Sequence, residues 1–135
     1  MPATFAIQIV TPERLVVETS AEEMQIPGKK GYLGILPGHA PLITELAVGE
    51  ITYRANGYTH HLSVAWGFAE VLPDKVTVLA ETAERAEEID IRRAREAKQR
   101  AEERLKSGNP EVDFNRAAIA LQRAETRLEV AEKKS

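Results

Sequence analysis

The stretch Glu84-Arg-Ala-Glu-Glu-Ile-Asp-Ile-Arg-Arg-Ala94 divides the sequence into two differently patterned parts. Before it, apolar residues recur at about every second position, which is the period of a strand with one buried face. After it, they recur every three or four positions, which is the period of an amphipathic helix. The sequence therefore predicts a sheet domain over residues 1–84 and a helical domain over residues 85–135, joined at a hinge that suits a switch better than a catalytic centre.

The composition changes at the same point. Residues 1–84 carry 5 basic and 10 acidic side chains and seven of the eight glycines, whereas residues 85–135 carry 13 basic and 11 acidic side chains. A chain of 135 residues can form one ordinary domain, or a small domain with an appendage that buries no core of its own. The uneven composition favours the second alternative.

Several functional classes are disfavoured by composition alone. A net charge of -3 gives no support to a nucleic-acid partner, which requires a basic surface. The absence of cysteine excludes disulfides, thiolate nucleophiles and sulfur-ligated metals. No apolar run approaches the length of a membrane span or an export signal, so the chain is expected to stay on the side of the membrane where it is made.

Short apolar segments fill the first part of the chain. Their close spacing, with no helical pattern between them, predicts an antiparallel β-sandwich or a flattened barrel. Phe5, Ile7 and Ile9 are expected on one face of the first strand. Strands are predicted over residues 5–10, 15–18, 23–26, 68–71 and 75–80, with a hairpin over residues 51–64.

The hairpin has the clearest local signal, because Asn56-Gly57 is the preferred pair for a two-residue type I′ turn. The turn fixes the register and places Tyr53 opposite His60. His61 then points to the other face of the sheet, so the two neighbouring histidines cannot share a metal ion. No metal site is predicted, and cross-strand packing or solvent accounts for these side chains.

Residues 31–44 are rich in glycine and proline and are predicted to form a rigid, exposed loop, in which Pro37-Gly38 suits a type II turn. Trp66 and Phe68 are interpreted as core and sheet-edge packing residues, in preference to a ligand-binding pair. No nucleophile elbow, glycine-rich phosphate loop or carboxylate pair at useful spacing is present, so an enzyme is not predicted.

Two amphipathic helices are predicted in the second part. Asp90 is a suitable N-cap for the first helix, which must end at Ser107-Gly-Asn-Pro110, and Asp113 lies near the start of the second. Their apolar seam is mostly alanine, which buries little area, so the antiparallel hairpin should depend on docking against the sandwich, a ligand or another chain. The seam consists of Ile91, Ala94, Ala97, Ala101 and Leu105, and of Phe114, Ala117, Leu121, Ala124, Leu128 and Ala131.

The arginines lie about 100° from this seam. If the chain folds back at Asn109, Arg93 lies level with the turn between Arg123 and Arg127, and guanidiniums gather near the hinge. They could form a solvated surface with ion pairs along each helix. They could also form an anion site for a phosphate chain, because arginine forks match phosphate oxygens. The residues concerned are Arg93, Arg100 and Arg104, Arg116, Arg123 and Arg127, with Glu84 and Asp90 near the hinge.

Four segments, in this order, make the sequence similar to the epsilon subunit of the bacterial F-type ATP synthase over its whole length. Trp66 departs from that family, which usually has glycine there. The segments are Gly34-Ile-Leu-Pro-Gly-His-Ala-Pro-Leu-Ile-Thr44, Val64-Ala-Trp-Gly-Phe-Ala-Glu-Val71, Val76-Thr-Val-Leu-Ala-Glu-Thr-Ala83 and the tail containing Leu121-Gln-Arg-Ala124.

The resemblance implies a non-catalytic rotor subunit that couples proton translocation to ATP synthesis. Its sandwich would attach to the gamma subunit and the c-ring, with Tyr32, Pro37, Gly38 and His39 at subunit interfaces. Its hairpin would lie folded, or extend along gamma towards the alpha and beta subunits and inhibit ATP hydrolysis. The expected location is the cytoplasmic face of the bacterial plasma membrane, with the membrane reached only through the complex.

The resemblance also implies a regulatory ATP site in some members, with the pattern Ile or Leu, Asp, two variable residues, Arg, Ala. Here Ile89-Asp90-Ile91-Arg92-Arg93-Ala94 matches it completely. No cofactor is required, and ATP is expected as a regulatory ligand. A free-standing small-ligand binding module with the hairpin as its lid is the alternative. The ATP-binding residues carried over by position are Glu84, Asp90, Arg93, Arg100, Arg123 and Arg127.

Overall fold

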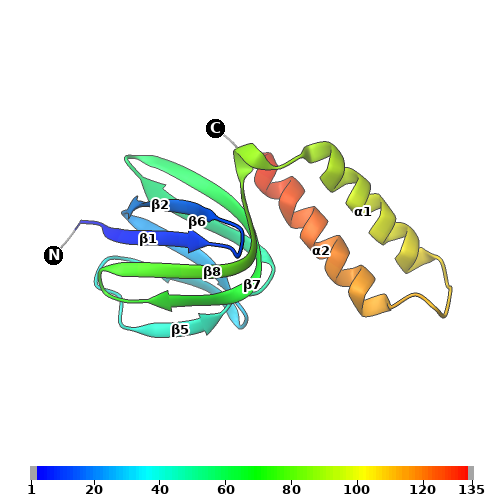
Figure 1. Cartoon of the computed structure of the whole chain (residues 1–135), viewed down its shortest axis with the longest axis horizontal. Coiled ribbons are helices and arrows are strands. Elements are labelled where there is room, and N and C mark those ends of the chain that lie inside the picture. Colours follow the sequence, from blue (N-terminus) through cyan, green and yellow to red (C-terminus); the bar gives the residue numbers. More distant parts are fainter. Residues whose placement is uncertain (1–2, 134–135) are drawn as a thin grey trace.

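The computed structural model describes residues 3–133 and consists of a β-sandwich followed by two helices (Figure 1). The strands pair in the order β2-β1-β8-β7-β6-β3-β4, and β5 pairs with β7. The predicted sandwich and helical hairpin are thereby confirmed. The strands are β1 (Phe5–Val10), β2 (Leu15–Ala21), β3 (Glu23–Gly28), β4 (Gly31–Ile35), β5 (Leu42–Glu45), β6 (Gly49–Ala55), β7 (Tyr58–Val71) and β8 (Lys75–Arg85).

Strand β8 lies between β7 and β1 and connects the sandwich to the hairpin. It pairs with β7 antiparallel but with β1 parallel, Ile7 lying opposite Val76 and Ile9 opposite Val78. Within residues 3–133 this is the one strand pair that departs from the antiparallel prediction. No local turn could indicate its direction, because about 65 residues separate the two strands.

Branched apolar side chains fill the interior of the sandwich. Phe5, Ile7 and Ile9 are all buried, as their alternation along β1 predicts. Partners from the other strands complete one core, which includes Met24, Ile26, Ile35, Ile51, Leu62, Val64, Val71, Val76 and Val78.

The β6–β7 hairpin has the register that its turn predicts. Asn56 and Gly57 both have positive φ, 53° and 81°, as a type I′ turn requires. Tyr53 lies opposite His60, and their rings stack with centroids 4.8 Å apart. His60 is therefore a cross-strand packing residue.

The segment predicted as one loop contains two strands. β4 forms over residues 31–35 and β5 over residues 42–45, so the loop prediction is wrong for these residues. β4 pairs with β3, and β5 pairs with β7. These pairings supply backbone hydrogen bonds for two strands that the glycine and proline content of the segment did not predict. The type II turn is confirmed: Gly38 has φ 85°, and the His39 amide donates to the Leu36 carbonyl at 3.2 Å.

Strand β7 bends at Trp66-Gly67, which allows one 14-residue strand where two short ones were predicted. Both residues have positive φ, 55° and 114°. A Cβ on Gly67 would collide with the Leu79 carbonyl, so glycine is required there. The Trp66 backbone lies in the left-handed region, which costs a residue with a bulky side chain about 1–3 kcal/mol. Phe68 is 54% exposed, so of the two predicted alternatives, core or sheet-edge packing, it does not belong to the core.

The hairpin begins with a 3₁₀ turn η1 (Ala86–Glu88) and contains α1 (Ile91–Lys106) and α2 (Phe114–Ala131). The Asp90 carboxylate caps α1 by accepting from the Arg93 amide at 3.1 Å, and Asp113 caps α2 in the same way at 3.0 Å. The alanine seam is confirmed at the buried residues Ala94, Ala101, Ala117 and Ala124. Phe114 is 65% exposed, so its place on the seam was wrong.

A second, small core attaches the hairpin near the hinge. It joins η1 to the end of α2 and contains Ala86, Ile89, Val130 and Ala131, with Ile91 packed against it. Figure 1 shows α2 next to the sandwich and α1 on the outside. Side chains of α2 can therefore contribute to the same site as side chains of the sheet.

Candidate functional site

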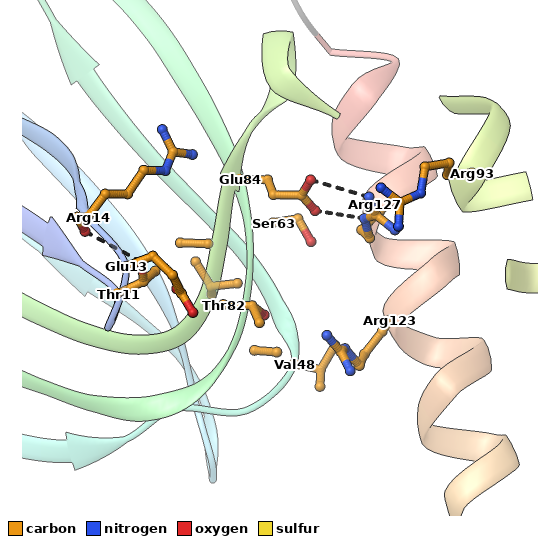
Figure 2. Close-up of a pocket in the computed structure, with 13 residues that line it drawn as sticks. Thr11, Glu13, Arg14, Val48, Ser63, Thr82, Glu84, Arg93, Arg123 and Arg127 are labelled. Carbon is orange, nitrogen blue, oxygen red and sulfur yellow. Dashed lines mark hydrogen bonds and ion pairs between the residues drawn. The ribbon is translucent and has the colours of Figure 1, made fainter. Parts of the chain in front are cut away.

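A cavity of about 440 Å³ lies between the sandwich and the hairpin (Figure 2). Its walls come from the β1–β2 turn, β7, β8 and both long helices. It is lined by Thr11, Glu13, Arg14, Val48, Ser63, Val64, Ala65, Thr82, Ala83, Glu84, Arg93, Arg123 and Arg127.

An ion pair between Glu84 and Arg127 joins strand β8 to helix α2 at this cavity. Arg127 Nε lies 2.7 Å from one Glu84 carboxylate oxygen, and a terminal guanidinium nitrogen donates to the other at 3.2 Å. The buried Nε–H is not aligned for a hydrogen bond. The pair is partly buried, with side-chain exposures of 24% for Arg127 and 34% for Glu84, so its charges are less screened than surface charges.

Arg93 and Arg123 bring two further positive charges to the cavity. Figure 2 shows Arg93 reaching from α1 towards Arg127, and Arg123 lying one turn along α2. Among the described residues neither forms an ion pair with a carboxylate. Three guanidiniums therefore border the cavity near the Glu84 carboxylate, and the excess positive charge favours an anion.

The structure brings together four of the six residues that sequence predicts for ATP: Glu84, Arg93, Arg123 and Arg127. Asp90 does not line the cavity, because its carboxylate is used to cap α1. Arg100 is exposed further along α1 and does not line it either. The cavity wall formed by Thr11, Glu13 and Arg14 was missed, because no local pattern relates the β1–β2 turn to a hinge 70 residues away.

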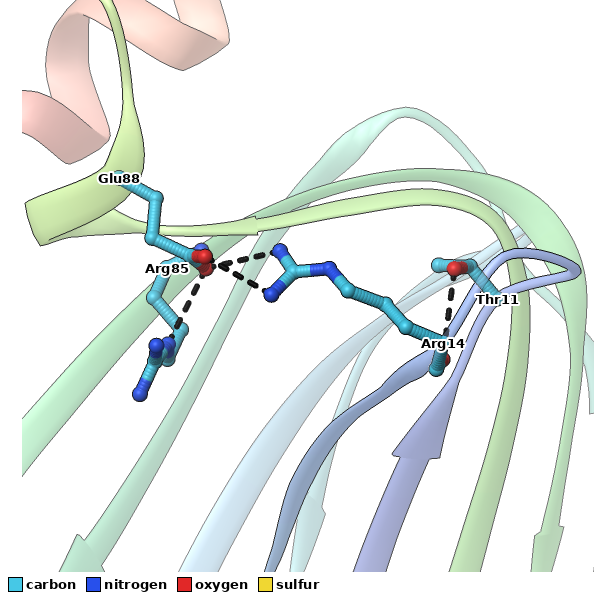
Figure 3. A network of polar contacts seen from close by, with 4 residues as sticks. All are labelled: Thr11, Arg14, Arg85 and Glu88. Atoms are coloured by element: carbon cyan, nitrogen blue, oxygen red, sulfur yellow. Dashed lines mark hydrogen bonds and ion pairs between the residues drawn. The ribbon is translucent and has the colours of Figure 1, made fainter.

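A second polar cluster fixes the hinge to the sandwich (Figure 3). Arg14 contacts both oxygens of Glu88, at 2.8 and 3.0 Å. The backbone amide and the side chain of Arg85 each donate to Glu88 at 3.1 Å. The Arg14 hydrogen bond, with help from Arg85, lowers the pKa of Glu88 to about 2. Glu88 also raises the pKa of Arg14.

The residues expected at subunit interfaces do not form one group. Pro37, Gly38 and His39 form the turn after β4, where the Gly38 amide donates to the Pro73 carbonyl at 2.8 Å. Tyr32 lies at the other end of β4, and its hydroxyl accepts from the Glu50 amide at 2.9 Å. Glu50 in turn accepts from Lys133 beyond α2, so Tyr32 lies on the hairpin side of the sandwich.

Two kinds of site are not found in the part of the chain that the structure describes. No group of three histidine, aspartate or glutamate side chains could hold a metal ion there. Neither helix within that part is both long and apolar enough to cross a membrane.

The two halves match two family models. The β-sandwich domain of the ATP synthase delta/epsilon chain matches residues 4–86, and the long α-helix domain of that chain matches residues 87–132. This chain, a sandwich followed by a helical hairpin with an arginine-lined cavity between them, is therefore of the delta/epsilon class.

Two bacterial relatives identify the branch. The ATP synthase epsilon chain of Koribacter versatilis is 68% identical over 111 residues, covering 82% of this chain and 78% of that one. The epsilon chain of Nitratidesulfovibrio vulgaris (strain DP4) is 53% identical over 105 residues, covering 78% of each. The chain belongs to the ATP synthase epsilon chain family, whose members are non-catalytic subunits of the rotary, membrane-associated ATP synthase.

Solved structures agree in fold. A chain in the Euglena gracilis mitochondrial ATP synthase structure (OSCP/F1/c-ring) matches with a TM-score of 0.82 at 24% identity, over 98% of this chain and 83% of that one. A chain in the Tetrahymena thermophila mitochondrial ATP synthase central stalk/c-ring structure matches with a TM-score of 0.54 at 12% identity, over 96% of this chain and 94% of that one. At these identities the likeness concerns the fold alone.

Proposed function

We propose that this subunit senses ATP, which binds between the sandwich and the hairpin and holds the hairpin folded. The observation that carries the proposal is the convergence of Arg93, Arg123 and Arg127 with Glu84 at one cavity. These residues come from three elements, β8, α1 and α2. When ATP is scarce, the hairpin opens, extends along the gamma subunit towards alpha and beta, and inhibits ATP hydrolysis.

The cavity suits a nucleoside triphosphate in size and charge. Its volume of about 440 Å³ lies within the usual range for small-molecule sites, roughly 300–1,000 Å³. Arginine forks can bind phosphate oxygens in pairs, and Arg93 and Arg123 are not engaged by a carboxylate among the described residues. Arg127 already pairs with Glu84, so a phosphate must compete with that carboxylate. This competition should moderate the affinity.

The regulatory effect follows from linkage. The site is complete only when the two helices lie side by side with α2 next to the sandwich, so ATP binds the folded hairpin better than the extended one. A ligand at about 100 times its dissociation constant favours the binding-competent state by about 2.7 kcal/mol. Such a bias is large enough to reverse a balance of about 1–2 kcal/mol between the two arrangements.

The sandwich supplies the attachment to gamma and the c-ring in this proposal. An exposed apolar patch supports it: Phe68 and Leu79 lie opposite each other on β7 and β8, and Ile43 lies on neighbouring β5. Their exposures are 54%, 55% and 70%. Neighbouring exposed apolar side chains of this size mark contact surfaces. The coupling of proton translocation to ATP synthesis, at the cytoplasmic face of the plasma membrane, depends on this attachment.

The ATP proposal is tested by calorimetric titration of the isolated chain with ATP. Arg93→Ala should weaken binding at least tenfold, because it removes a charged phosphate partner. Arg92→Ala is the matched control, because Arg92 is the neighbouring arginine, is 89% exposed and pairs with Glu96 on its own helix. The sandwich should keep its thermal transition in both variants. If Arg93→Ala binds ATP as the parent does, the arginines form a solvated surface.

Deletion of residues 88–135 tests the division of labour. Assembly and ATP synthesis should be largely retained, because the exposed apolar patch stays in place. The restraint on ATP hydrolysis should change, as measured in membranes carrying the truncated subunit. Loss of assembly would overturn the assignment of attachment to the sandwich.

A further inference from the structure

Trp66, the single tryptophan of the chain, contacts helix α2. Trp66 lies at the bend of β7 with a φ of 55°. A bulky residue in the left-handed region is strained, and such strain persists only where the surroundings hold it. The side chain must therefore make contacts that compensate for this conformation.

The contact partner is Arg123. Its guanidinium carbon lies 5.2 Å from the centroid of the Trp66 ring, which is within the range of a cation–π interaction. Arg123 belongs to the middle of α2, one turn before Arg127. The contact thus joins β7 to the middle of α2, away from the small core around Val130 at the end of that helix.

Two further observations place this contact at the docking surface of the hairpin. Ile119 and Gln122 of α2 line the same cavity as Trp66 and Gly67, so this part of β7 faces one side of the helix. Arg123 also lines the anion cavity, of which Trp66 is not a lining residue. The guanidinium therefore has one face towards the indole while its side chain borders the cavity.

We infer that Trp66 is a docking residue that holds α2 against the sandwich through Arg123 and presents that guanidinium to the anion cavity. The folded hairpin is then stabilised by the chain itself before any ligand binds. This goes beyond ATP sensing: it requires the hairpin to open, but it does not require ATP to bind.

Hydrogen exchange of the ligand-free, full-length chain tests the inference. Trp66→Gly removes the indole and relieves the strained φ, so it should affect the two domains differently. Protection of the α2 amides should fall about two- to fivefold, the factor that an exposed cation–π contact corresponds to. Protection of the β8 amides should stay equal or rise, because glycine suits the bend.

Three other variants make the result specific. Arg123→Gln should reduce α2 protection by the same factor, and the double variant should add nothing further, because both substitutions remove one contact. Trp66→Phe keeps the strain and part of the ring interaction, so it should fall between the parent and Trp66→Gly. Arg116→Gln is the control, since Arg116 is an exposed arginine of α2 that lies near the turn between the helices.

Unchanged α2 protection in Trp66→Gly would overturn the inference, and so would full additivity of the Trp66 and Arg123 variants. A loss of β8 protection equal to that of α2 would also overturn it, because Trp66 would then support the sandwich as a whole. Each of these results is obtained without nucleotide. Failure of ATP titration would therefore leave this test intact.

Discussion

The sandwich and the hairpin are built from side chains of different size. The sandwich buries isoleucine, leucine and valine on most strands, each worth about 1.5–3 kcal/mol when removed from water. The hairpin buries alanines along its seam, each of which contributes little more than one methyl group. The difference predicts that the hairpin is less stable than the sandwich and opens separately from it.

The contacts between the two parts are few and partly polar. They include the Glu84–Arg127 ion pair, the Lys133–Glu50 ion pair at 2.9 Å and the contact of Arg123 with the Trp66 ring. Regions with few buried apolar contacts open separately from the global transition. Substitutions should therefore separate the stability of the sandwich from the docking of the hairpin.

The largest effect is expected from Leu62→Ala, which empties a fully buried position in the sandwich. It should lower the free energy of unfolding by about 2–5 kcal/mol, measured by denaturant titration. Ala124→Gly, its counterpart in the seam, should cost about 1 kcal/mol and lower hydrogen-exchange protection only across residues 90–132. Equal loss of protection in residues 76–80 for both variants would mean that the two parts unfold together.

The next effect concerns the ion pair between the two parts. Arg127→Met removes the partner of Glu84 and should shift the hairpin towards the open form by about 1–2 kcal/mol, measured by exchange of the α2 amides. The comparison variant is Arg92→Gln, which breaks the exposed pair with Glu96 and should change stability by less than about 0.5 kcal/mol. Similar results for both would show that the Glu84 pair is as weak as a surface pair.

A smaller effect separates the two possible roles of Asp90. Asp90→Ala should destabilise α1 by about 1 kcal/mol through loss of the N-cap, as Asp113→Ala should destabilise α2. Asp90→Ser keeps a capping oxygen and removes the charge, so it should preserve helix stability by circular dichroism. If Asp90→Ser also preserves ATP affinity, Asp90 acts only as a cap; a lower affinity would assign its carboxylate to the ligand.

The smallest effect is a pH dependence at the hinge. The pKa of Glu88 falls from 4.5 to about 2 in the folded protein, chiefly through the Arg14 hydrogen bond. Its stabilisation is therefore fully present above pH about 4.5 and is lost as the pH falls towards 2. Because Glu88 is partly exposed, we expect only about 0.5–1 kcal/mol. Acid titration of Glu88→Gln should lack this loss, and identical acid profiles for both proteins would contradict it.

Local signals predicted some parts of the fold accurately. Asn56-Gly57 specifies a turn and hence the register of β6 and β7, and Asp90 and Asp113 specify two helix starts. The parallel pairing of β1 and β8 depends on contacts between distant segments, which no local pattern contains. The continuous β7 was missed because a bend at Trp66 requires a positive φ that tryptophan rarely adopts.

The candidate site was predictable to a similar extent. Helical periodicity and the resemblance together placed Arg93, Arg123 and Arg127 near Glu84, and the structure places them at one cavity. Periodicity could not tell that Arg100 lies outside the cavity, or that Arg14 approaches it from the β1–β2 turn. Both facts depend on side-chain geometry and on tertiary contacts.

The position of β8 has a mechanical consequence. This strand is hydrogen-bonded on both sides, to β1 and to β7, and it leads directly into the hinge. A pull on the hairpin therefore acts along β8 and across two rows of hydrogen bonds, which run perpendicular to the strands on the antiparallel β7 side and at a slant on the parallel β1 side. All of these bonds must shear together, whereas the contacts of α2 with the sheet can peel apart one after another. Under tension the hairpin should swing out long before the strand that carries it slides.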